Sequence, residues 1–419
     1  MMRKLLTTVV TASMCASLAA ETTATSVYTK CNWLNDATCA ITLTFDDGLA
    51  NQFSTMVPLL DNYGLKGTFY IVTDWAERDG IWPELRRLSD NGHEIGSHTL
   101  THPTISGLDE LVRSRQILEQ KTGKPCLTVA YPYCNLPTDP AANAALEENY
   151  ISGRTCSGQL VAHNTTDMYN ISSIVTGTEG RIKTSDDMLG MFENARDEKR
   201  WCVFLTHEIN KGSGYSPTQS REFKKALIYL KNNPNSYWVA TFADVSKYIR
   251  ENRASTVTEL SATQDRIVVS VTCKLDSALY DSPITIRRAM PDGWSTAEVT
   301  QGGEVVKSWT DKNHTCIYFN VVPGAGDVTI FNGAMRVHEI YDESGDERMS
   351  VTLSDDFIIV NSDAPASRLE LSDMSGRVVF SSSDGNVIPV RKVQGGSYVL
   401  RAFWDDNTSS ARKLYLSAR

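Results

Sequence analysis

Short apolar segments alternate with amphipathic segments from about Ala40 to Ser255, and this alternation constrains the fold more than any other feature of the chain. The apolar segments are rich in Ile, Val, Phe, Tyr and Thr and are bounded by breakers, which is typical of buried strands. We expect strands at residues 41–45, 67–72, 94–97, 127–131, 151–155, 201–206 and 237–241. We expect helices at residues 51–63, 83–91, 108–122, 186–199, 220–232 and 243–252. Such alternation predicts an α/β domain with a parallel sheet, either open or closed into a barrel.

The helical periodicity ends after Ser255. Residues 256–345 contain short strand patterns separated by Gly, Pro and Asp turns, which predicts an all-β sandwich. Residues 355–419 follow a charged stretch and predict a second small β domain. The aromatic residues of the first β domain form either the sandwich core, which we favour, or a carbohydrate-binding surface; they include Trp294, Trp309 and Tyr318.

Residues 1–20 have the pattern of a cleaved secretory signal peptide. Arg3 and Lys4 precede an apolar run that closes on Ala19 and Ala20, small residues that suit a signal peptidase. The run is too short to span a bilayer, so we expect a secreted or cell-surface protein with no stable membrane span. Cleavage leaves eight cysteines. An even set in an exported chain predicts disulfides, and Cys273 with Cys316 is the pair that we expect.

The formal net charge of the chain is -9. Nucleic-acid binding is driven by clustered Lys and Arg, so this acidity argues against a nucleic-acid partner. Neutral and cationic substrates both remain open.

Candidate metal ligands follow two of the predicted strands. Asp46 and Asp47 precede Gly48, which allows a turn, so one carboxylate can bind a cation while the other stays free as a base. His98 and His102 are four residues apart, so both imidazoles can face one point. Alone, each motif has a plain alternative: a simple turn, or two structural histidines. Together, two imidazoles and a carboxylate form a three-ligand metal site with open positions for water and substrate.

A further candidate, His207, follows the strand predicted at 201–206. The carboxyl ends of parallel strands face the active-site mouth in such folds. An unligated histidine there can protonate a leaving group near neutral pH. A structural histidine at a strand end is the alternative.

These motifs resemble those of the polysaccharide deacetylases of carbohydrate esterase family 4. The family's Thr-Phe-Asp-Asp-Gly stands at residues 44–48, its His-Ser/Thr-x-x-His at 98–102 and its Leu-x-His at 205–207. The resemblance covers roughly residues 30–250, within a domain that we place at 30–255. It implies a distorted (β/α) barrel, followed here by the two small all-β sandwich domains.

By this resemblance, Asp46 is the catalytic base and His207 the general acid. Asp47, His98 and His102 then hold a divalent metal ion, and zinc is our first choice. The metal ion would polarise an acetyl carbonyl and its attacking water. The chain would thus be a hydrolase that removes acetyl groups from a polysaccharide.

Two family features are missing from this chain. An Arg that steadies the base two residues before Pro-Tyr is replaced by Ala130, and we hypothesise that Arg154 supplies the charge from another strand. The Asp-Trp motif that orients the catalytic His is not found either, and three aspartates remain as undecided candidates: Asp167, Asp186 and Asp187. The residues that we expect to bind substrate are Tyr131, Pro132, Tyr133 and Arg154, although core packing remains an equal alternative for the two tyrosines.

Residues 355–419 resemble the C-terminal sorting domains of the type IX secretion system. The resemblance lies in residues 371–378, 396–401 and 413–416. It implies a partner in the outer-membrane secretion machinery, followed by release or surface attachment. An immunoglobulin-like spacer is the alternative.

Acetylated xylan or another plant polysaccharide is the first expected substrate, and N-acetylglucosamine-type glycans such as chitin and peptidoglycan come next. A non-catalytic glycan-binding surface protein, built on a decayed deacetylase domain, is the alternative function. The missing Arg at Ala130 favours that alternative, whereas the complete set of metal ligands and base argues against it.

Overall fold

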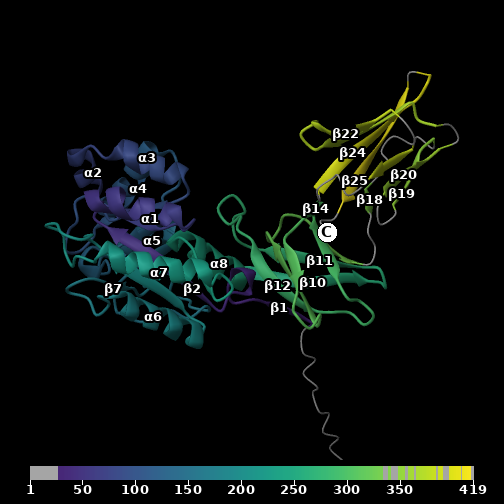
Figure 1. Cartoon of the computed structure of the whole chain (residues 1–419). Helices are drawn as coiled ribbons and strands as arrows, with labels where there is room; N and C mark the ends of the chain where they lie inside the picture. The colour runs from purple at the N-terminus through teal and green to yellow at the C-terminus, as the bar shows by residue number, and fades with distance from the viewer. Residues whose placement is uncertain are drawn as a thin grey trace, which may run out of the picture.

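The computed structural model describes residues 27–333, 338–340, 348–353, 357–362, 365–383, 386–389, 396–406 and 408–416. Figure 1 shows the helices in the purple-to-teal part of the chain, followed by green strands and then by yellow strands. The chain therefore has one α/β part and, after it, two groups of all-β sheets. The signal peptide expected at residues 1–20 lies outside the described residues.

A parallel sheet forms the centre of the α/β part. Its strand order is β6-β5-β4-β3-β2-β8-β7, and β9 pairs with β2. The strands are β2 (Cys39–Asp46), β3 (Thr68–Ile71), β4 (Glu94–Ser97), β5 (Thr128–Ala130), β6 (Ser152–Arg154), β7 (Ile174–Val175), β8 (Trp201–Thr206) and β9 (Tyr237–Val239). The order ends at β6 and β7, which are joined to each other by no ladder among the described strands. The α/β prediction is confirmed, and the expected distorted barrel is observed as a curled, open half-barrel.

The side chains of β2 alternate between the helix-covered face of the sheet and its inner face, where polar groups lie. All residues of β2 are buried, as expected for a parallel strand that is covered on both faces. Ile41, Leu43 and Phe45 lie in the large core cluster that the helices cover. Because side chains alternate along a strand, Thr44 and Asp46 face the other way, into the curl of the sheet.

The helices are α1 (Val57–Asn62, after a π-helical turn at Gln52–Met56), α2 (Thr73–Asp79), α3 (Trp82–Asp90), α4 (Leu108–Thr122), α5 (Pro140–Asn149), α6 (Ser185–Glu198), α7 (Ser220–Asn232) and α8 (Phe242–Ala254). All six predicted helices are present, and all seven predicted strands. The prediction omitted α2, α5 and β7. Helix α5 was not predicted because alanines lie on both its buried and its exposed face, which weakens the amphipathic pattern.

The first β unit has two antiparallel sheets, ordered β1-β12-β16-β15 and β10-β11-β17-β13-β14. In Figure 1 its strands are green, apart from β1, which is purple. Their strands are β1 (Tyr28–Lys30), β10 (Ser255–Ala262), β11 (Arg266–Cys273), β12 (Ile284–Ala289), β13 (Ala297–Gln301), β14 (Glu304–Val305), β15 (Ser308–Thr310), β16 (Cys316–Val321) and β17 (Val328–Asn332). Strand β1 precedes the α/β part in sequence but pairs with β12, so this unit draws on both sides of the α/β part. Trp294 is 8% exposed in its core, whereas Trp309 and Tyr318 stack on each other across strands.

The yellow part of Figure 1 also has two antiparallel sheets, ordered β18-β25-β24-β21-β22 and β19-β20-β23. The strands are β18 (His338–Ile340), β19 (Ser350–Leu353), β20 (Phe357–Asn361), β21 (Arg368–Asp373), β22 (Val378–Ser382), β23 (Val387–Pro389), β24 (Gly396–Phe403) and β25 (Ser409–Leu416). A separate apolar cluster that includes Ile358, Leu371 and Leu400 fills the space between them. This packing supports a small independent β unit.

A disulfide joins Cys134 to Cys156. The expectation that Cys273 pairs with Cys316 is wrong, because both thiols are free. The two residues lie on strands of different sheets, β11 and β16, and the sequence pattern gave no information on their separation. The other free thiols in the described part of the chain are Cys31, Cys39, Cys126 and Cys202, all of them buried.

None of the helices in the described residues is both long enough and apolar enough to cross a membrane.

Helix α8 connects the α/β part to the first β unit through buried polar contacts. The Tyr248 hydroxyl donates to the carbonyl of Cys31 at 2.9 Å. The Glu251 side chain is fully buried, and its Oε1 accepts from the Ser282 backbone N–H at 3.0 Å. Its other oxygen, Oε2, has no hydrogen-bond partner among the described residues. Burial therefore raises the pKa of the Glu251 carboxyl to about 7.

We predict that this carboxyl makes the free energy of unfolding depend on pH. The folded chain keeps a proton on Glu251 that the unfolded chain releases, so stability falls as the pH rises from about 4.5 to about 7. The contribution is on the order of 2 to 3 kcal/mol. In urea titrations at both ends of this range, Glu251→Gln should lose less stability than the wild type. Glu193→Gln, on the exposed surface of α6, should behave as the wild type. Equal pH dependence in all three proteins would contradict the assignment.

Candidate metal and acid–base site

Two acidic side chains project from the end of β2. Asp46 is the last residue of the strand and is 2% exposed. Asp47 adopts a positive φ of 76°, and Gly48 follows with a φ of 70°. This left-handed turn brings the second carboxylate round to the same mouth as the first, because strand alternation no longer applies after Asp46. The sequence predicted a turn at Gly48, and in the structure this turn begins one residue earlier, at Asp47.

The two histidines that follow β4 lie opposite Asp47. Their loop is not helical, since Thr99 and His102 have φ values of 69° and 65°. Nε2 of His98 lies 3.6 Å from Oδ1 of Asp47, and Nε2 of His102 lies 3.8 Å from the same oxygen. One donor atom from each of the three residues lies within 4.8 Å of the other two. The structure therefore brings the three sequence-predicted ligands together.

The protonation pattern of these groups fits a metal ion. The Nδ1–H of His98 donates to the carbonyl of Ala130 at 2.8 Å, which leaves the Nε2 lone pair free to ligate. Oδ1 of Asp47 is buried and has no hydrogen-bond partner among the described residues. Burial, and then the charge of Asp46, raise the pKa of Asp47 to about 7. Burial lowers the pKa of His98 to about 4. A divalent cation would offset the repulsion between the two buried carboxylates, because it stabilises the charged form of Asp47 and binds neutral imidazoles.

Aromatic rings hold His102 in place. Its ring stacks on Trp75 with centroids 5.2 Å apart and an interplanar angle of 25°. The ring of Tyr133 meets it edge-on at 4.9 Å. Whereas His98 is oriented by a hydrogen bond, His102 is therefore oriented largely by packing. Trp75 was not singled out from the sequence, since a lone tryptophan carries no signal of such a contact.

Arg154 is the charge partner of Asp46. Its Nη2 donates to Oδ2 of Asp46 at 2.5 Å, and its Nη1 donates to the Ser173 hydroxyl at 3.1 Å. The guanidinium also lies over the ring of Tyr70, at 5.1 Å from its centroid. Burial by itself would raise the pKa of Asp46, but the charge of Arg154 leads the effects that outweigh it, and this pKa lies below its ordinary value. Asp46 is thus a carboxylate at neutral pH.

The pairing register of β5 and β6 explains how the side chain of Arg154 comes to lie beside Asp46. Ala130 on β5 and Arg154 on β6 lie directly opposite each other on neighbouring parallel strands. Side chains at paired positions of a parallel ladder point to the same face. An arginine at 154 therefore enters the curl of the sheet beside the position where the resemblance led us to expect one, at 130.

His207 lies on the other side of Asp46. Its Nε2 is 4.0 Å from Oδ2 of Asp46, and its ring meets the ring of Tyr215 edge-on at 5.1 Å. Burial lowers the pKa of the His207 imidazole. Its Nδ1 has no hydrogen-bond partner within the described ranges. The three aspartates considered for orienting this ring do not bond to it: Asp167, Asp186 and Asp187 are exposed, and Asp187 caps α6.

Gln52 couples the two strand ends that carry Asp46 and His207. Its side-chain amide donates to the carbonyl of Asp46 at 2.6 Å and to the carbonyl of His207 at 2.8 Å. Gln52 is fully buried in the π-helical turn after β2. Sequence reasoning missed this residue because a glutamine in a helical segment carries no motif.

The four residues that were expected to bind substrate differ in their exposure to solvent. Tyr131 is 1% exposed, and its hydroxyl donates to the carbonyl of Tyr169 at 2.8 Å, so it is a core residue rather than part of a sugar subsite. Pro132 is buried as well. Tyr133 is 66% exposed beside His102. Arg154 is 1% exposed and bonded to Asp46, so its guanidinium pairs with a buried carboxylate and is not a surface contact for sugar.

Backbone strain gathers around this mouth. Besides Asp47, Thr99 and His102, the neighbours Tyr133 and Cys134 have positive φ values of 52° and 61°. Such residues cost roughly 1 kcal/mol or more each, and they are typical of functional sites. The Cys134–Cys156 disulfide holds this strained segment to the loop that follows β6.

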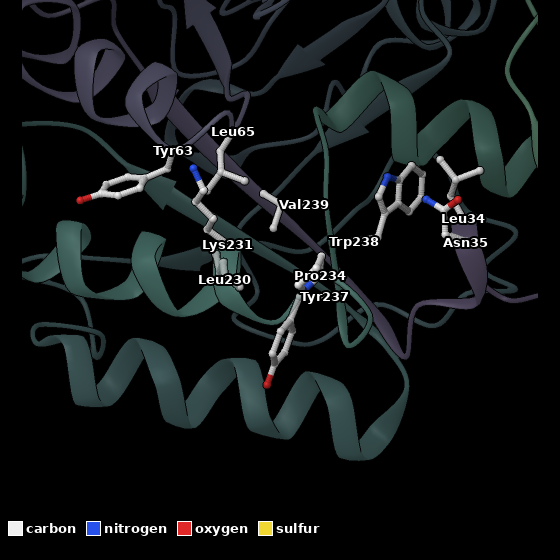
Figure 2. A pocket seen from close by; sticks show the side chains of 10 residues that line it. All are labelled: Leu34, Asn35, Tyr63, Leu65, Leu230, Lys231, Pro234, Tyr237, Trp238 and Val239. Atoms are coloured by element: carbon white, nitrogen blue, oxygen red, sulfur yellow. The ribbon is translucent and has the colours of Figure 1, made fainter. Parts of the chain in front are cut away.

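A cavity of about 260 Å³ lies elsewhere in the α/β part (Figure 2). Its lining includes Leu65, which precedes β3, and Tyr237, the first residue of β9. The candidate site is instead built from residues that follow strand ends. The lining of the cavity contains no His, Cys, Asp or Glu, so it lacks the usual metal ligands, and its titratable side chains are those of Tyr63, Lys231 and Tyr237.

The part of the chain that carries the candidate site is similar in sequence to known proteins. Residues 35–149 match the family model of polysaccharide deacetylases, a range that contains both aspartates and the first two histidines of the site. A peptidoglycan-N-acetylglucosamine deacetylase of Bacillus cereus is 27% identical over 26% of this chain and 42% of that protein. These matches support a polysaccharide deacetylase domain.

A gellan lyase of a Bacillus species is 27% identical over 349 residues, which is 74% of this chain but 14% of that protein. This match covers more of the chain than the deacetylase domain alone. The crystal structure of a putative polysaccharide deacetylase from Mycobacterium smegmatis aligns with 54% of this chain and 94% of that one, with a TM-score of 0.42 and 18% identity. The chain spans less than half the length of both curated relatives.

We predict that a guanidinium at either of two positions can serve Asp46. Arg154→Ala should lower deacetylase activity about 100-fold and raise the pKa on the acidic limb of the pH–rate profile, because Asp46 loses its buried counter-charge. Adding Ala130→Arg should restore part of the activity and lower that pKa again, since the new side chain starts from the paired position and fills the vacated space.

The matched control for this pair is Ala130→Leu with Arg154→Ala, which fills the space without a charge. Activity and the pH–rate profile are measured for all variants, and circular dichroism checks that each is folded. If the double variant with Ala130→Arg performs no better than the double variant with Ala130→Leu, the charge-relocation account is contradicted.

Proposed function

We propose that the deacetylase domain is a metal-dependent hydrolase that removes acetyl groups from a polysaccharide. The observation that carries this proposal is the juxtaposition of two unlike carboxylates. Asp47 faces His98 and His102 in a metal-binding arrangement, and Asp46 faces Arg154. In such a pair, one carboxylate, here Asp47, can bind the metal ion, while the other, here Asp46, can act as the base.

Asp47, His98 and His102 would hold the metal ion. Two imidazoles and a carboxylate suit zinc and leave coordination positions open for water and substrate. A bound cation would act as a Lewis acid on the acetyl carbonyl and would lower the pKa of the attacking water. The packing of Trp75 and Tyr133 on His102 fixes one ligand in the geometry that this requires.

Asp46 would be the general base. Its carboxylate is held ionised by Arg154, and its Oδ1 is buried without a partner among the described residues, so a lone pair is free to accept a proton. As a water molecule adds to the carbonyl carbon, Asp46 takes one of its protons.

His207 would be the general acid. Its Nε2 lies 4.0 Å from Oδ2 of Asp46, and it follows β8, which pairs with β2 on the edge away from β3 and β4. The bond between the carbonyl carbon and the sugar nitrogen or oxygen breaks, and His207 protonates that atom. Acetate and a sugar amine or alcohol are the products.

Acetylated xylan and N-acetylglucosamine-type glycans are the substrates that we put forward. The name of the Bacillus cereus relative points to an N-acetylglucosamine glycan. The alternative of a decayed, glycan-binding domain rested on the missing arginine at Ala130. The contact of Arg154 with Asp46 supports the catalytic proposal instead.

We further propose that the protein is secreted and that residues 355–419 direct it through a type IX secretion pathway. The Cys134–Cys156 disulfide supports an oxidising compartment. The signal-peptide pattern at residues 1–20 supports export across the inner membrane.

The catalytic proposal predicts metal-dependent acetate release. Zinc-loaded protein is incubated with acetylated xylan, acetylated chitooligosaccharides and peptidoglycan, and acetate is measured. Asp46→Asn should lower kcat by about 100-fold to 10,000-fold, because the base is lost. A chelator should abolish activity and added zinc restore it. Asp90→Asn, on the exposed end of α3, should retain activity. No release from any glycan by metal-loaded protein would contradict the proposal.

The secretion proposal predicts two observations in a bacterial host that has a type IX system. The full chain should appear at the cell surface or in the medium, with an N-terminus near residue 20 by peptide sequencing. A chain that ends after residue 354 should stay in the periplasm. Equal release of both chains would argue for an ordinary spacer at residues 355–419.

A further inference from the structure

One sheet of the first β unit carries aromatic and cationic side chains on its outer face. On β12 and β16, Ile286 and Phe319 belong to the apolar core, so their neighbours Arg287 and Tyr318 face outward. Arg287 pairs with Tyr318 across these strands, and Tyr318 pairs with Trp309 on β15. The rings of Trp309 and Tyr318 stack with centroids 5.4 Å apart and an interplanar angle of 9°. Both rings are partly exposed, so this aromatic pair lies on the surface of the unit.

A lysine extends this outer face beyond the aromatic pair. Nζ of Lys307 lies 5.4 Å from the centroid of the Trp309 ring and donates to Oδ1 of Asn35 at 2.7 Å. Nδ2 of Asn320 donates to the same oxygen at 2.9 Å. The backbone N–H of Asn35 donates in turn to Oγ1 of Thr285 at 2.7 Å. These hydrogen bonds fix the ammonium group of Lys307 beside the aromatic pair.

Asn35 also lines the cavity of about 260 Å³, so the outer face continues into a hollow. Figure 2 shows Asn35 and Trp238 at one end of this cavity, and Tyr63 and Lys231 at the other. Nζ of Lys231 lies 5.9 Å from the centroid of the Tyr63 ring. We call the cavity together with the outward-facing side chains the junction surface; the latter are Arg287, Lys307, Trp309 and Tyr318.

The cations of the junction surface have no acidic partner. Lys231, Lys307 and Arg287 form no ion pair with a carboxylate in the part of the chain that the structure describes. The lining of the cavity contains no Asp or Glu. Asp61, on α1, is paired with Lys66 at 3.1 Å. Although the formal net charge of the chain is -9, this surface therefore presents cations that are available to an anion.

Three acidic residues lie near the junction surface without pairing with its cations. Burial, and then the charge of Asp36, raise the pKa of Tyr318. The carboxylate of Asp311 accepts two backbone N–H groups of its own turn at 2.7 Å each, and Lys312 follows it in that turn. Asp244 accepts a backbone N–H at the start of α8. Backbone donors thus engage two of the three carboxylates, which leaves the cations of the surface unneutralised by direct contact.

We infer that the junction surface binds an acidic polysaccharide, with sugar rings against its aromatic side chains and uronate carboxylates at its cations. Aromatic rings pack against the apolar C–H faces of pyranose rings. Ammonium and guanidinium groups form charge-assisted hydrogen bonds with carboxylates. An uncharged glycan would use only the rings, and an acidic peptide would use mainly the cations. A surface on which cations lie beside aromatic rings fits a chain that offers both sugar faces and carboxylates.

The junction surface is separate from the candidate metal site. Tyr237, which lines the cavity, pairs with Cys39 at the start of β2, whereas Asp46 is the last residue of that strand. The strand has 8 residues, so its two ends are roughly 23 Å apart. A glycan held at the junction surface therefore leaves the metal site open. The inference does not depend on the deacetylase function.

The test measures binding of a galacturonate hexamer to the full chain by isothermal titration calorimetry. Lys231→Gln with Lys307→Gln removes two separate cations and should raise Kd about tenfold or more, and added salt should raise the wild-type Kd. Trp309→Ala should also raise Kd about tenfold, because a ring is lost from the aromatic pair. Xylohexaose, an uncharged chain, should bind about tenfold more weakly than the galacturonate hexamer.

The matched control is Lys224→Gln with Lys274→Gln, which changes the net charge equally at two exposed lysines outside the junction surface. It should bind as the wild type does, and circular dichroism checks that every variant is folded. The inference is wrong if the wild type does not bind the hexamer, or if the control loses as much affinity as Lys231→Gln with Lys307→Gln. Equal affinity for xylohexaose would exclude a role for the cations. Equal affinity for a glutamate hexapeptide would mean that the surface recognises charge and not a glycan, which also contradicts the inference.

Discussion

The buried ion pair between Asp46 and Arg154 is the interaction on which the site depends. The two residues are 2% and 1% exposed, and either charge left alone there would be strongly destabilising. They come from β2 and β6, which are four positions apart in the strand order. In a flat sheet these strands would be about 19 Å apart. A contact of 2.5 Å therefore requires the sheet to curl around its inner face.

The same curvature brings the other polar groups of the candidate site together. Asp47 follows β2 and the histidine pair follows β4, with β3 between them, while His207 enters from β8 on the other side. Each group stands at the carboxyl end of its strand, so all of them meet at one mouth. The two adjacent carboxylates have different pKa values, because Arg154 holds the pKa of Asp46 below its ordinary value, whereas burial and the charge of Asp46 raise the pKa of Asp47. That difference permits one to ligate and the other to act as a base.

The rim of the mouth is shaped by strained and packed segments rather than by regular strands. Trp75 and Tyr133 orient His102 from two directions, and a disulfide fastens the strained turn at Tyr133 and Cys134. This arrangement joins the geometry of the candidate metal ligands to that of the surface around them. The disulfide also links the loops that follow β5 and β6, whose strands carry Ala130 and Arg154.

Most strands and helices of the α/β part could be predicted from the periodicity of the sequence, and its motifs singled out Asp46, Asp47 and the histidines. These features are local, because periodicity and short motifs reflect the conformation of a few consecutive residues. Three features became evident in the folded chain alone: Arg154 meets Asp46 across 108 positions, Tyr131 is core while Tyr133 is exposed, and Cys134 pairs with Cys156. Each of these depends on strand register and on the curl of the sheet, which bring together residues whose separation in sequence carries no record of their distance in space.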